Sequence, residues 1–248
     1  MGRNRLGCEA LVKVTTHSRK IAVTVCALAF WSQAPGTRGE PRPDTPPAPT
    51  DYVRRLEAAL LLQTLNADLL SHDSASITLE RWCSAHHLAS PARITAERVR
   101  ATEKPATELQ RQRLQVTGLD EVRYRRVRLR CGTVIMSEAD NWYVPARLTA
   151  QMNEQLDSTD RPFGLVVQPL HFQRHTTASE MLWQPLPEGW EMSTPPANSE
   201  AGELCVPGEV LRHRALLTLP DGTPFSEVVE SYTSNLLATP RLRQLHPC

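Results

Sequence analysis

Three arginines alternate with apolar residues in the middle of the chain, and their side chains are the first candidates for chemistry. Arg126, Arg128 and Arg130 are each followed by an apolar residue, in the order valine, leucine and cysteine. This period of two is typical of a β-strand with one apolar face. A guanidinium stays charged and resists burial without an anionic partner. The pattern therefore predicts either a solvated strand face or a site for a negatively charged ligand.

Several other residues stand in an order that resembles one known family. The positions that carry the resemblance are Asp73–Thr78, Arg126, Ala139, Pro145, Pro162–Gly164, Arg174, and Gly222–Pro224 followed by Glu230. None of them is specific by itself. Taken together, their order and spacing between Leu60 and Leu236 resemble the chorismate pyruvate-lyase family.

The resemblance implies a role for each of five side chains. Arg126 corresponds to the arginine that holds the carboxylate of the aromatic ring, and Glu230 to the glutamate that meets the ring hydroxyl. Phe163 stands where the family has a leucine whose backbone helps to bind the carboxylate. Ile77 stands where a methionine lines the pocket. Arg174 is a further candidate for substrate binding.

The glutamate near the C-terminus has two candidates. Glu230 matches the family only after a shift of one residue beyond Pro224, so Glu227 remains an alternative. On a strand, Val228 and Tyr232 would share a face with Glu230 and could form the floor of a pocket.

The resemblance also implies a reaction. Members of the family eliminate pyruvate from chorismate and leave 4-hydroxybenzoate, with no metal or organic cofactor. Sheets of this type also serve as effector-binding domains of bacterial transcription regulators, and a fold alone does not determine function. The alternative is therefore a non-catalytic domain that binds a small aromatic carboxylate. In both cases the partner is a small molecule, and we expect a monomer.

The composition argues against a nucleic-acid partner. The 248 residues carry a formal net charge of +1, whereas a nucleic-acid-binding surface needs a basic patch. Only 5% of the residues are aromatic, which also disfavours a stacking platform for bases.

The first fifty residues have the features of a leader and a linker. The apolar run 21–31 follows Arg19 and Lys20, and it is too short to cross a bilayer but matches the core of a signal peptide. We expect a leader over 1–34 and a proline-rich linker over 35–50. No lipid or other stable membrane anchor is expected. The protein is then exported or periplasmic; if the leader is only an irregular N-terminus, it is cytoplasmic.

The cysteines beyond the leader leave their pairing open. Cys83, Cys131, Cys205 and Cys248 include no CxxC pair, so a structural zinc site is not expected. In an exported protein they could form two bridges, with three possible connectivities. Cys131 on the apolar strand face is expected to be a small buried hydrophobe.

Adjacent histidines at 86 and 87 do not change the expectation of no metal, because neighbouring helical side chains diverge.

The patterning predicts an α+β fold. Leucine spacing indicates helices over 51–70 and over 73–87. Further expected elements are a strand over 91–100, a polar loop over 104–113, a hairpin of 122–136 with 142–145, a helix over 147–156, a buried strand over 165–172, a strand over 179–186, and a hairpin of 210–219 with 224–232. An Asp-Gly step marks the last turn. We expect a folded domain over 51–240, with a tail at 241–248. Its antiparallel sheet has about six strands with N-terminal helices, which is similar to the chorismate lyase fold.

Overall fold

A computed structural model describes most of the chain beyond the first fifty residues. The described residues are 51–100, 103–193, 204–239, 242 and 246–247. The chain divides into two compact units, 1–46 and 47–248, and all described residues belong to the second. The expected leader, linker and most of the expected tail lie outside them.

Two helices begin the described chain and pack through leucine rows. In α1 (Asp51–Leu70) the buried residues Leu62, Leu65 and Leu69 recur at helical spacing. In α2 (Ala75–Ala85) the N-cap is Ser74, whose side-chain oxygen accepts a hydrogen bond from the Ile77 amide at 3.4 Å. Both helices therefore form close to where the sequence predicts them.

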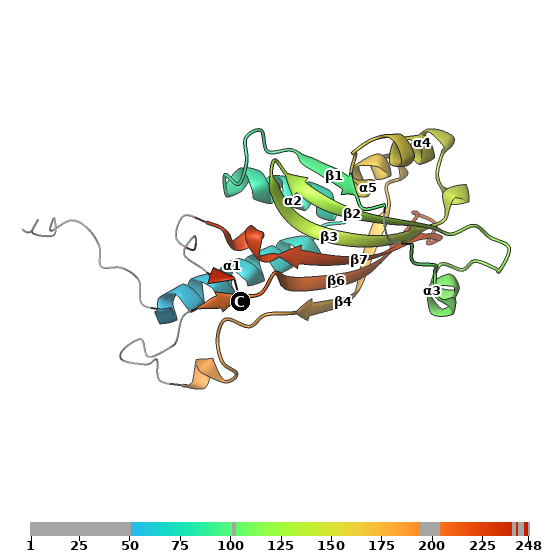
Figure 1. The fold of residues 1–248 in the computed structure, drawn as a ribbon. Helices are drawn as coiled ribbons and strands as arrows, with labels where there is room; N and C mark the ends of the chain where they lie inside the picture. The colour runs from blue at the N-terminus through green and yellow to red at the C-terminus, as the bar shows by residue number, and fades with distance from the viewer. Residues whose placement is uncertain (1–50, 101–102, 194–203, 240–241, 243–245, 248) are drawn as a thin grey trace, which may run out of the picture. The chain divides into compact units, whose positions relative to one another are not determined.

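A six-stranded antiparallel sheet forms the centre of the fold. The strands are β1 (Ile94–Arg98), β2 (Arg123–Cys131), β3 (Val134–Tyr143), β4 (Gln173–Met181), β6 (Glu209–Thr218) and β7 (Pro224–Thr233). Their spatial order is β1-β2-β3-β7-β6-β4, as Figure 1 shows. The short strands β5 (Cys205–Val206) and β8 (His246–Pro247) pair in parallel. The expectation of an α+β fold with an antiparallel sheet of about six strands and N-terminal helices is confirmed.

The remaining helices are short. They are α3 (Glu108–Arg113), α4 (Ala150–Ser158), α5 (Phe163–Val166) and 3₁₀ turns at Pro145–Arg147, Gln168–Leu170, Trp190–Met192 and Ser234–Leu237. In Figure 1, α4 and α5 lie at one end of the sheet.

Four expectations about local structure are wrong. The strand expected over 179–186 does not form as a separate strand, because β4 already begins at Gln173 and ends at Met181. The polar segment expected as a loop contains α3, where Thr107 and Gln110 form a capping box. The apolar run 165–172 is buried through α5 and a 3₁₀ turn, and the strand begins only at Gln173. The hairpin of β2 and β3 turns at Gly132, which adopts a φ of 58°, and the polar run 137–141 continues β3.

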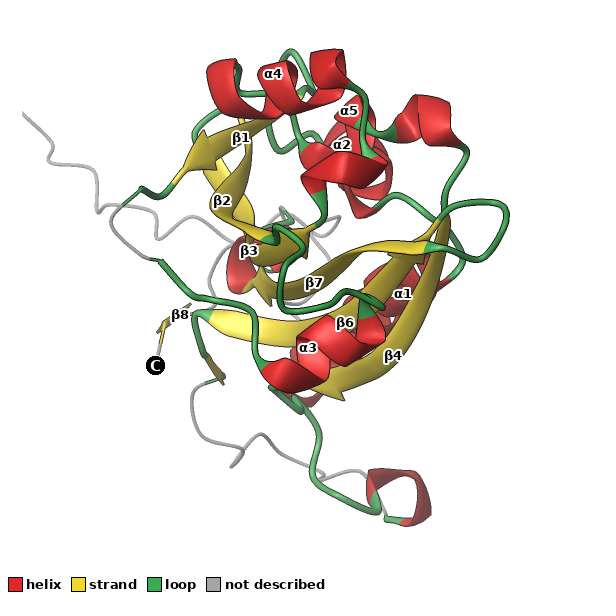
Figure 2. Ribbon diagram, turned by 90° about the vertical axis from the view of Figure 1, so that its right-hand side faces the viewer, coloured by secondary structure: helices red, strands yellow, loops and turns green. Residues whose placement is uncertain are grey.

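The two faces of the sheet differ in what covers them. On the first face, which we call the pocket face, Val127 and Leu129 pack in a core with leucines of α1 and α2. The other face, which we call the outer face, carries Arg126 on β2. Figure 2 shows α1 and α3 on opposite sides of the sheet.

One buried ion pair fastens α3 to the outer face. The Glu227 side chain on β7 is 1% exposed and accepts two hydrogen bonds from Arg113, both at 2.7 Å. Gln110 donates a longer bond to the same carboxylate at 3.5 Å. A bidentate arginine–carboxylate pair of this kind has a defined geometry, so it determines where α3 lies.

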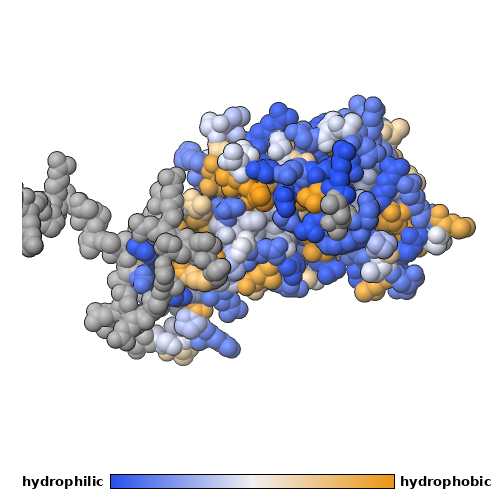
Figure 3. Space-filling view, viewed as in Figure 1, coloured by the Kyte–Doolittle hydropathy of each residue, from blue (hydrophilic) through white to orange (hydrophobic). Residues whose placement is uncertain are grey.

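Hydrophilic side chains cover most of the surface seen in Figure 3, with small hydrophobic patches between them. Among the described residues, no helix has the length and apolar content needed to cross a bilayer.

A disulfide joins α2 to the end of β2. Cys83 and Cys131 are both fully buried, and 48 positions separate them in the sequence. The expectation that Cys131 is a buried residue of the apolar face is confirmed, and its side chain is in addition one half of this bridge.

We expect the bridge to contribute strongly to stability. Closing a loop of this length lowers the entropy of the unfolded chain by an amount worth about 4 kcal/mol. The double variant Cys83→Ala, Cys131→Ala should therefore lose about that much free energy of unfolding in a urea titration. A loss below about 1 kcal/mol would contradict the expectation.

Candidate functional site

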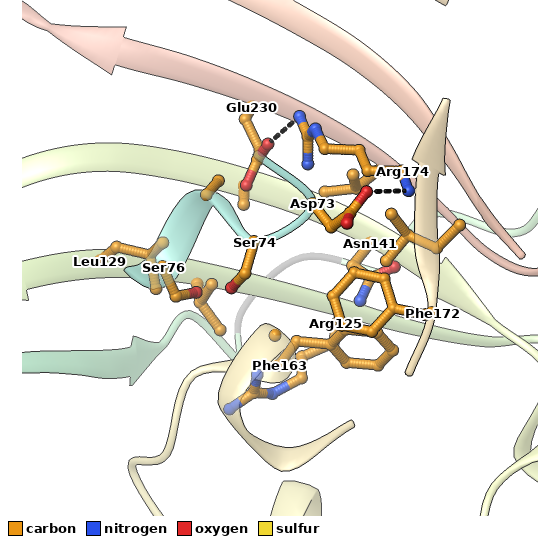
Figure 4. Close-up of a pocket in the computed structure, with 16 residues that line it drawn as sticks. Asp73, Ser74, Ser76, Arg125, Leu129, Asn141, Phe163, Phe172, Arg174 and Glu230 are labelled. Carbon is orange, nitrogen blue, oxygen red and sulfur yellow. Dashed lines mark hydrogen bonds and ion pairs between the residues drawn. The ribbon is translucent and has the colours of Figure 1, made fainter. Parts of the chain in front are cut away.

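A pocket lies on the pocket face of the sheet, between the start of α2 and α5. Its empty volume is about 490 Å³, which includes the open mouth. Five strands contribute to it together with the two helices. The lining residues are Asp73, Ser74, Ala75, Ser76, Arg125, Val127, Leu129, Ala139, Asn141, Phe163, Gly164, Phe172, Arg174, Leu217, Val228 and Glu230. Figure 4 shows them.

One side of the pocket contains a cation without an acidic partner. Arg125 on β2 is only 3% exposed. Its Nη2 donates to the carbonyl oxygen of Arg161 at 3.3 Å, and its Nε and Nη1 have no hydrogen-bond partner within the described part of the chain. Burial, together with repulsion from nearby Arg98, lowers the pKa of Arg125 to about 10, while the charges of Tyr143 and Asp157 oppose the shift. At neutral pH the guanidinium is still charged.

The other end of the pocket contains a neutralised pair. Arg174 on β4 donates to Glu230 on β7 at 2.6 Å, and the two side chains are 4% and 7% exposed. The Tyr232 hydroxyl also donates to Glu230, at 3.1 Å, and the backbone amide of Arg174 donates to Asp73 at 2.9 Å. In Figure 4 this pair and the Arg125 guanidinium lie at opposite ends of the pocket. Within the described residues, no carboxylate forms an ion pair with Arg125, although the Asp73 carboxylate lines the same pocket beside Arg174.

Apolar side chains line the space between these two ends. Phe163 and Phe172 come from the α5 region, and Leu217 and Val228 come from β6 and β7. Phe225, buried beneath them, stacks on Phe163 with ring centres 6.3 Å apart. Apolar walls with few polar groups are typical of small-molecule sites.

The mouth of the pocket depends on a close approach of two helices. A Cβ atom at Gly164 would lie 2.7 Å from the side-chain oxygen of Ser74. Only glycine lets α5 come this near to the N-cap of α2. Ser74 and Ser76 both line the pocket here and supply hydroxyl groups at its rim.

The structure brings together three of the five predicted site residues. Glu230, Phe163 and Arg174 all line the pocket. Ile77, in the first turn of α2, is not among the lining residues.

The prediction that Arg126 faces this pocket together with Glu230 is wrong. Arg126 lies on the outer face, where it donates to Glu138 at 2.7 Å. A second carboxylate, that of Asp140, lies 4.0 Å away. The physical reason is the pleat of the strand, because residues one position apart point to opposite faces of a sheet.

The sequence contains a signal for the arginine that does face the pocket. Arg125 has the same parity as Val127 and Leu129, so it shares their buried face. An arginine at the same parity as the apolar residues of a strand points to their buried face. It is therefore a better candidate for a site residue than the three arginines at the opposite parity, which need not be buried.

The same parity decides between the two glutamates. Glu230 pairs with Ala139 across β3 and β7 and faces the pocket, whereas Glu227 lies on the outer face with Arg113. The pocket residue is therefore Glu230.

A buried histidine extends the polar network behind Glu230. His213 on β6 lies opposite Glu230 and is fully buried. Its Nε2 lies 2.8 Å from the Asn66 side-chain oxygen, which only accepts, so we place the ring proton on Nε2. The Tyr232 ring packs edge-on against it, with centres 5.3 Å apart. Within the described residues, Nδ1 has no hydrogen-bond partner.

Within the described residues, no group of three or more histidine, cysteine or acidic side chains could hold a metal ion.

A comparison with curated proteins identifies one relative over most of the chain. It is the uncharacterized protein y4mC of Sinorhizobium fredii, which is 49% identical over 227 residues, or 91% of this chain and 95% of y4mC. The chain belongs to the y4mC family. No family model matches the sequence.

Several solved structures resemble the fold at much lower identity. The possible transcriptional regulator YydK of Bacillus subtilis is 12% identical with a TM-score of 0.35, covering 58% of this chain and 59% of YydK. The ligand-binding domain of a putative GntR-family transcriptional regulator from Bordetella bronchiseptica is 14% identical with a TM-score of 0.36, covering 57% and 83%. PhnF of Mycobacterium smegmatis is 12% identical with a TM-score of 0.42, covering 66% and 65%. At these scores we infer no function from them.

The burial of His213 predicts a stability change at acid pH. Burial lowers the pKa of His213 to about 4, with a smaller contribution in the same direction from Arg174, while Glu230 opposes both. Because the pKa is about 6.5 in the unfolded chain, the unfolded state binds an extra proton between pH 6.5 and 4. Stability is therefore present above pH 6.5 and is lost as the pH falls through this window, by about 3 kcal/mol.

Urea titrations at pH 7 and pH 4 measure this loss. Wild type should lose about 3 kcal/mol more between them than the variant His213→Leu, which has no titrating group at this position. The matched control His72→Leu, at an exposed histidine of the loop after α1, should lose as much as wild type. Equal losses in wild type and His213→Leu would contradict the assignment.

Proposed function

We propose that this chain binds a small aromatic carboxylate in the pocket and does not turn it over. The observation that carries the proposal is the Arg125 guanidinium, which is buried and has two donor nitrogens without a partner in the described chain. Burying a charge without a counter-charge is strongly unfavourable. A ligand carboxylate would supply both the missing charge and the missing acceptors.

The charge of the pocket sets the charge of the group that binds there. Since Arg174 is paired with Glu230 and Asp73 lies beside Arg174, Arg125 is the charged lining residue with which a ligand carboxylate would pair directly. An arginine can hold a carboxylate through two parallel hydrogen bonds. Each hydrogen bond to a charged group contributes about 1.5–3 kcal/mol.

The walls of the pocket favour a ring next to that carboxylate. Phe163, Phe172, Leu217 and Val228 supply apolar contact between the two polar ends. Polar substituents on the ring could reach the Ser74 and Ser76 hydroxyls or the Asn141 amide, which line the same space. Because these polar groups are few, they would favour ligands whose polar ring substituents lie within hydrogen-bonding distance of them.

A chorismate lyase activity is the second candidate, and one observation favours it. Glu230, which the resemblance places at the ring hydroxyl, lines the same pocket as a free guanidinium. In that reaction Arg125 would hold the ring carboxylate in place of Arg126. We rank it second because Arg174 and Tyr232 already hold Oε2 of Glu230, which leaves Oε1 alone for a ring hydroxyl.

Two measurements on the full chain separate these candidates. A binding domain should be stabilised by 4-hydroxybenzoate in a thermal shift assay, because a ligand that binds only the folded state raises its stability. It should release no pyruvate from chorismate. Pyruvate release that disappears in Glu230→Gln would instead establish the lyase.

We further propose that the protein is exported, and the Cys83–Cys131 disulfide supports this. Disulfides persist in oxidising compartments and are rare in the cytosol. Fractionation of cells that express the full chain tests the proposal, and recovery of only the reduced protein from the cytosol would contradict it.

Replacing Arg125 should separate binding from stability. The variant Arg125→Met should lose binding of 4-hydroxybenzoate, with a Kd at least 100-fold higher, because the ligand carboxylate no longer meets a cation. Its free energy of unfolding should stay equal or rise by about 1–3 kcal/mol, since methionine removes an uncompensated buried charge. Calorimetric titration and urea unfolding measure the two quantities. A variant that binds as wild type does would contradict the role of Arg125.

Arg126→Met is the matched control for this experiment. It removes a cation from the adjacent position on the outer face, where Glu138 already neutralises it. Its affinity for 4-hydroxybenzoate should match that of wild type.

A further inference from the structure

The Arg125 side chain borders a second hollow besides the pocket. A surface groove of about 750 Å³ lies where β1 ends and β2 begins, next to the end of α4. Its lining residues are Arg98, Val99, Arg100, Glu103, Tyr124, Arg125, Arg126 and Asp157. We call it the basic groove. Arg125 is the residue that the lining of the basic groove and the lining of the pocket have in common.

The strand pairing explains why arginines gather here. Arg98 pairs with Val127 across β1 and β2, so it shares the pocket face with Arg125. The pairing continues past the end of β1, where the Val99 amide donates to the Arg126 carbonyl at 2.9 Å. Continued by one position, the same register brings Arg100 opposite Arg125. Repulsion from Arg98 is one of the reasons that the pKa of Arg125 is lowered, after burial.

The carboxylates at hand do not balance these cations. The basic groove has four arginines and two acidic residues in its lining. The Asp157 carboxylate lies 3.7 Å from Arg98 and 3.3 Å from Arg123, so two cations share it. Arg126 is already paired with Glu138. Within the described part of the chain, Arg100 forms no ion pair.

We infer that Arg98 and Arg100 form an anion subsite outside the pocket, which accepts a second negatively charged group of the ligand. The inference rests on the proposed function and extends it. The first carboxylate lies on Arg125 with its ring in the pocket, and the second anionic group lies in the basic groove. The occupant is then an aromatic compound with two anionic groups close together, joined by a short flexible link.

The subsite also affects how the ligand arrives. A cluster of uncompensated cations around a concave surface raises the local concentration of anions and their association rate. Added salt screens such exposed charges more than buried ones. A doubly charged ligand should therefore lose more affinity in salt than a singly charged ligand held by Arg125 alone.

Two probes that differ by one carboxylate test the inference. Benzylsuccinate has a phenyl ring and two carboxylates, and 4-phenylbutyrate lacks one of them. With the full chain in calorimetric titrations at pH 7.5, benzylsuccinate should bind at least tenfold more tightly than 4-phenylbutyrate in 50 mM salt. The preference should shrink several-fold in 300 mM salt.

Variants localise the preference. The double variant Arg98→Gln, Arg100→Gln should reduce the preference for benzylsuccinate over 4-phenylbutyrate to less than threefold and leave the Kd of 4-phenylbutyrate unchanged. The control Arg81→Gln removes an exposed arginine of α2, which pairs with Asp68 and lines neither the pocket nor the basic groove. It should keep the full preference.

The outcomes distinguish this inference from the function on which it rests. If neither probe binds while 4-hydroxybenzoate does, the inference is overturned and the proposed function stands; if none of the three binds, the proposed function is wrong. If both bind with equal affinity, the pocket binds a carboxylate and the outer subsite does not exist. If the preference for benzylsuccinate survives in the double variant, the second carboxylate lies elsewhere and the assignment to Arg98 and Arg100 is overturned.

Discussion

The burial of one cation without a counter-charge is the constraint on which the site depends. A flexible arginine could escape this situation by extending into water. Arg125 is kept in place because its strand lies in the middle of a β1–β2–β3 segment and because the Arg161 carbonyl accepts one of its hydrogen bonds. The Cys83–Cys131 bridge also fastens α2 to the same strand, so the wall opposite Arg125 is held as well. The surrounding fold therefore maintains a buried charge that has no ion-pair partner in the described chain, and the proposed ligand would compensate it.

The arginines of the outer face show what the same side chain does in a structural role. Arg126 and Arg128 both donate to Glu138, and Arg130 donates to Glu97 on β1. These pairs are partly exposed, and exposed ion pairs contribute 0–1 kcal/mol each. They keep this face of the sheet polar where it meets water. Whether an arginine has an ion-pair partner, more than its position on a central strand, distinguishes the arginine of the pocket from the structural arginines.

Much of the fold can be predicted from the sequence, because its signals are local. The helical leucine spacing of α1, the alternation in β2 and the Asp-Gly turn between β6 and β7 each depend on a few neighbouring residues. The segment of α3 does contain a local helix signal, the capping box of Thr107 and Gln110, but its polar composition favours a loop; the contact that joins α3 to the sheet, between Arg113 and Glu227, spans 114 positions. The apolar run 165–172 was misassigned because burial alone does not distinguish a strand from short helical turns.

The candidate site is harder to predict, because single-residue shifts have large consequences in a sheet. Phe163, Arg174 and Glu230 were found from a resemblance in spacing. The arginine that the resemblance assigns to the carboxylate, Arg126, lies one position beyond Arg125, which lines the pocket, and in a strand one position places a side chain on the opposite face. The disulfide required knowledge of which strand lies against α2, which no spacing of cysteines contains.

The geometry of the buried pair bears on what Glu230 can do for a ligand. Arg174 and Tyr232 both donate to Oε2 of Glu230, at 2.6 and 3.1 Å. An ionised carboxylate accepts hydrogen bonds at both of its oxygens, so Oε1 can accept one from a ring hydroxyl while the pair with Arg174 stays intact. Such a bond to a charged group contributes about 1.5–3 kcal/mol. Glu230 at one end of the pocket and Arg125 at the other can therefore orient a hydroxylated aromatic carboxylate between them, and this positioning serves binding without requiring a chemical step.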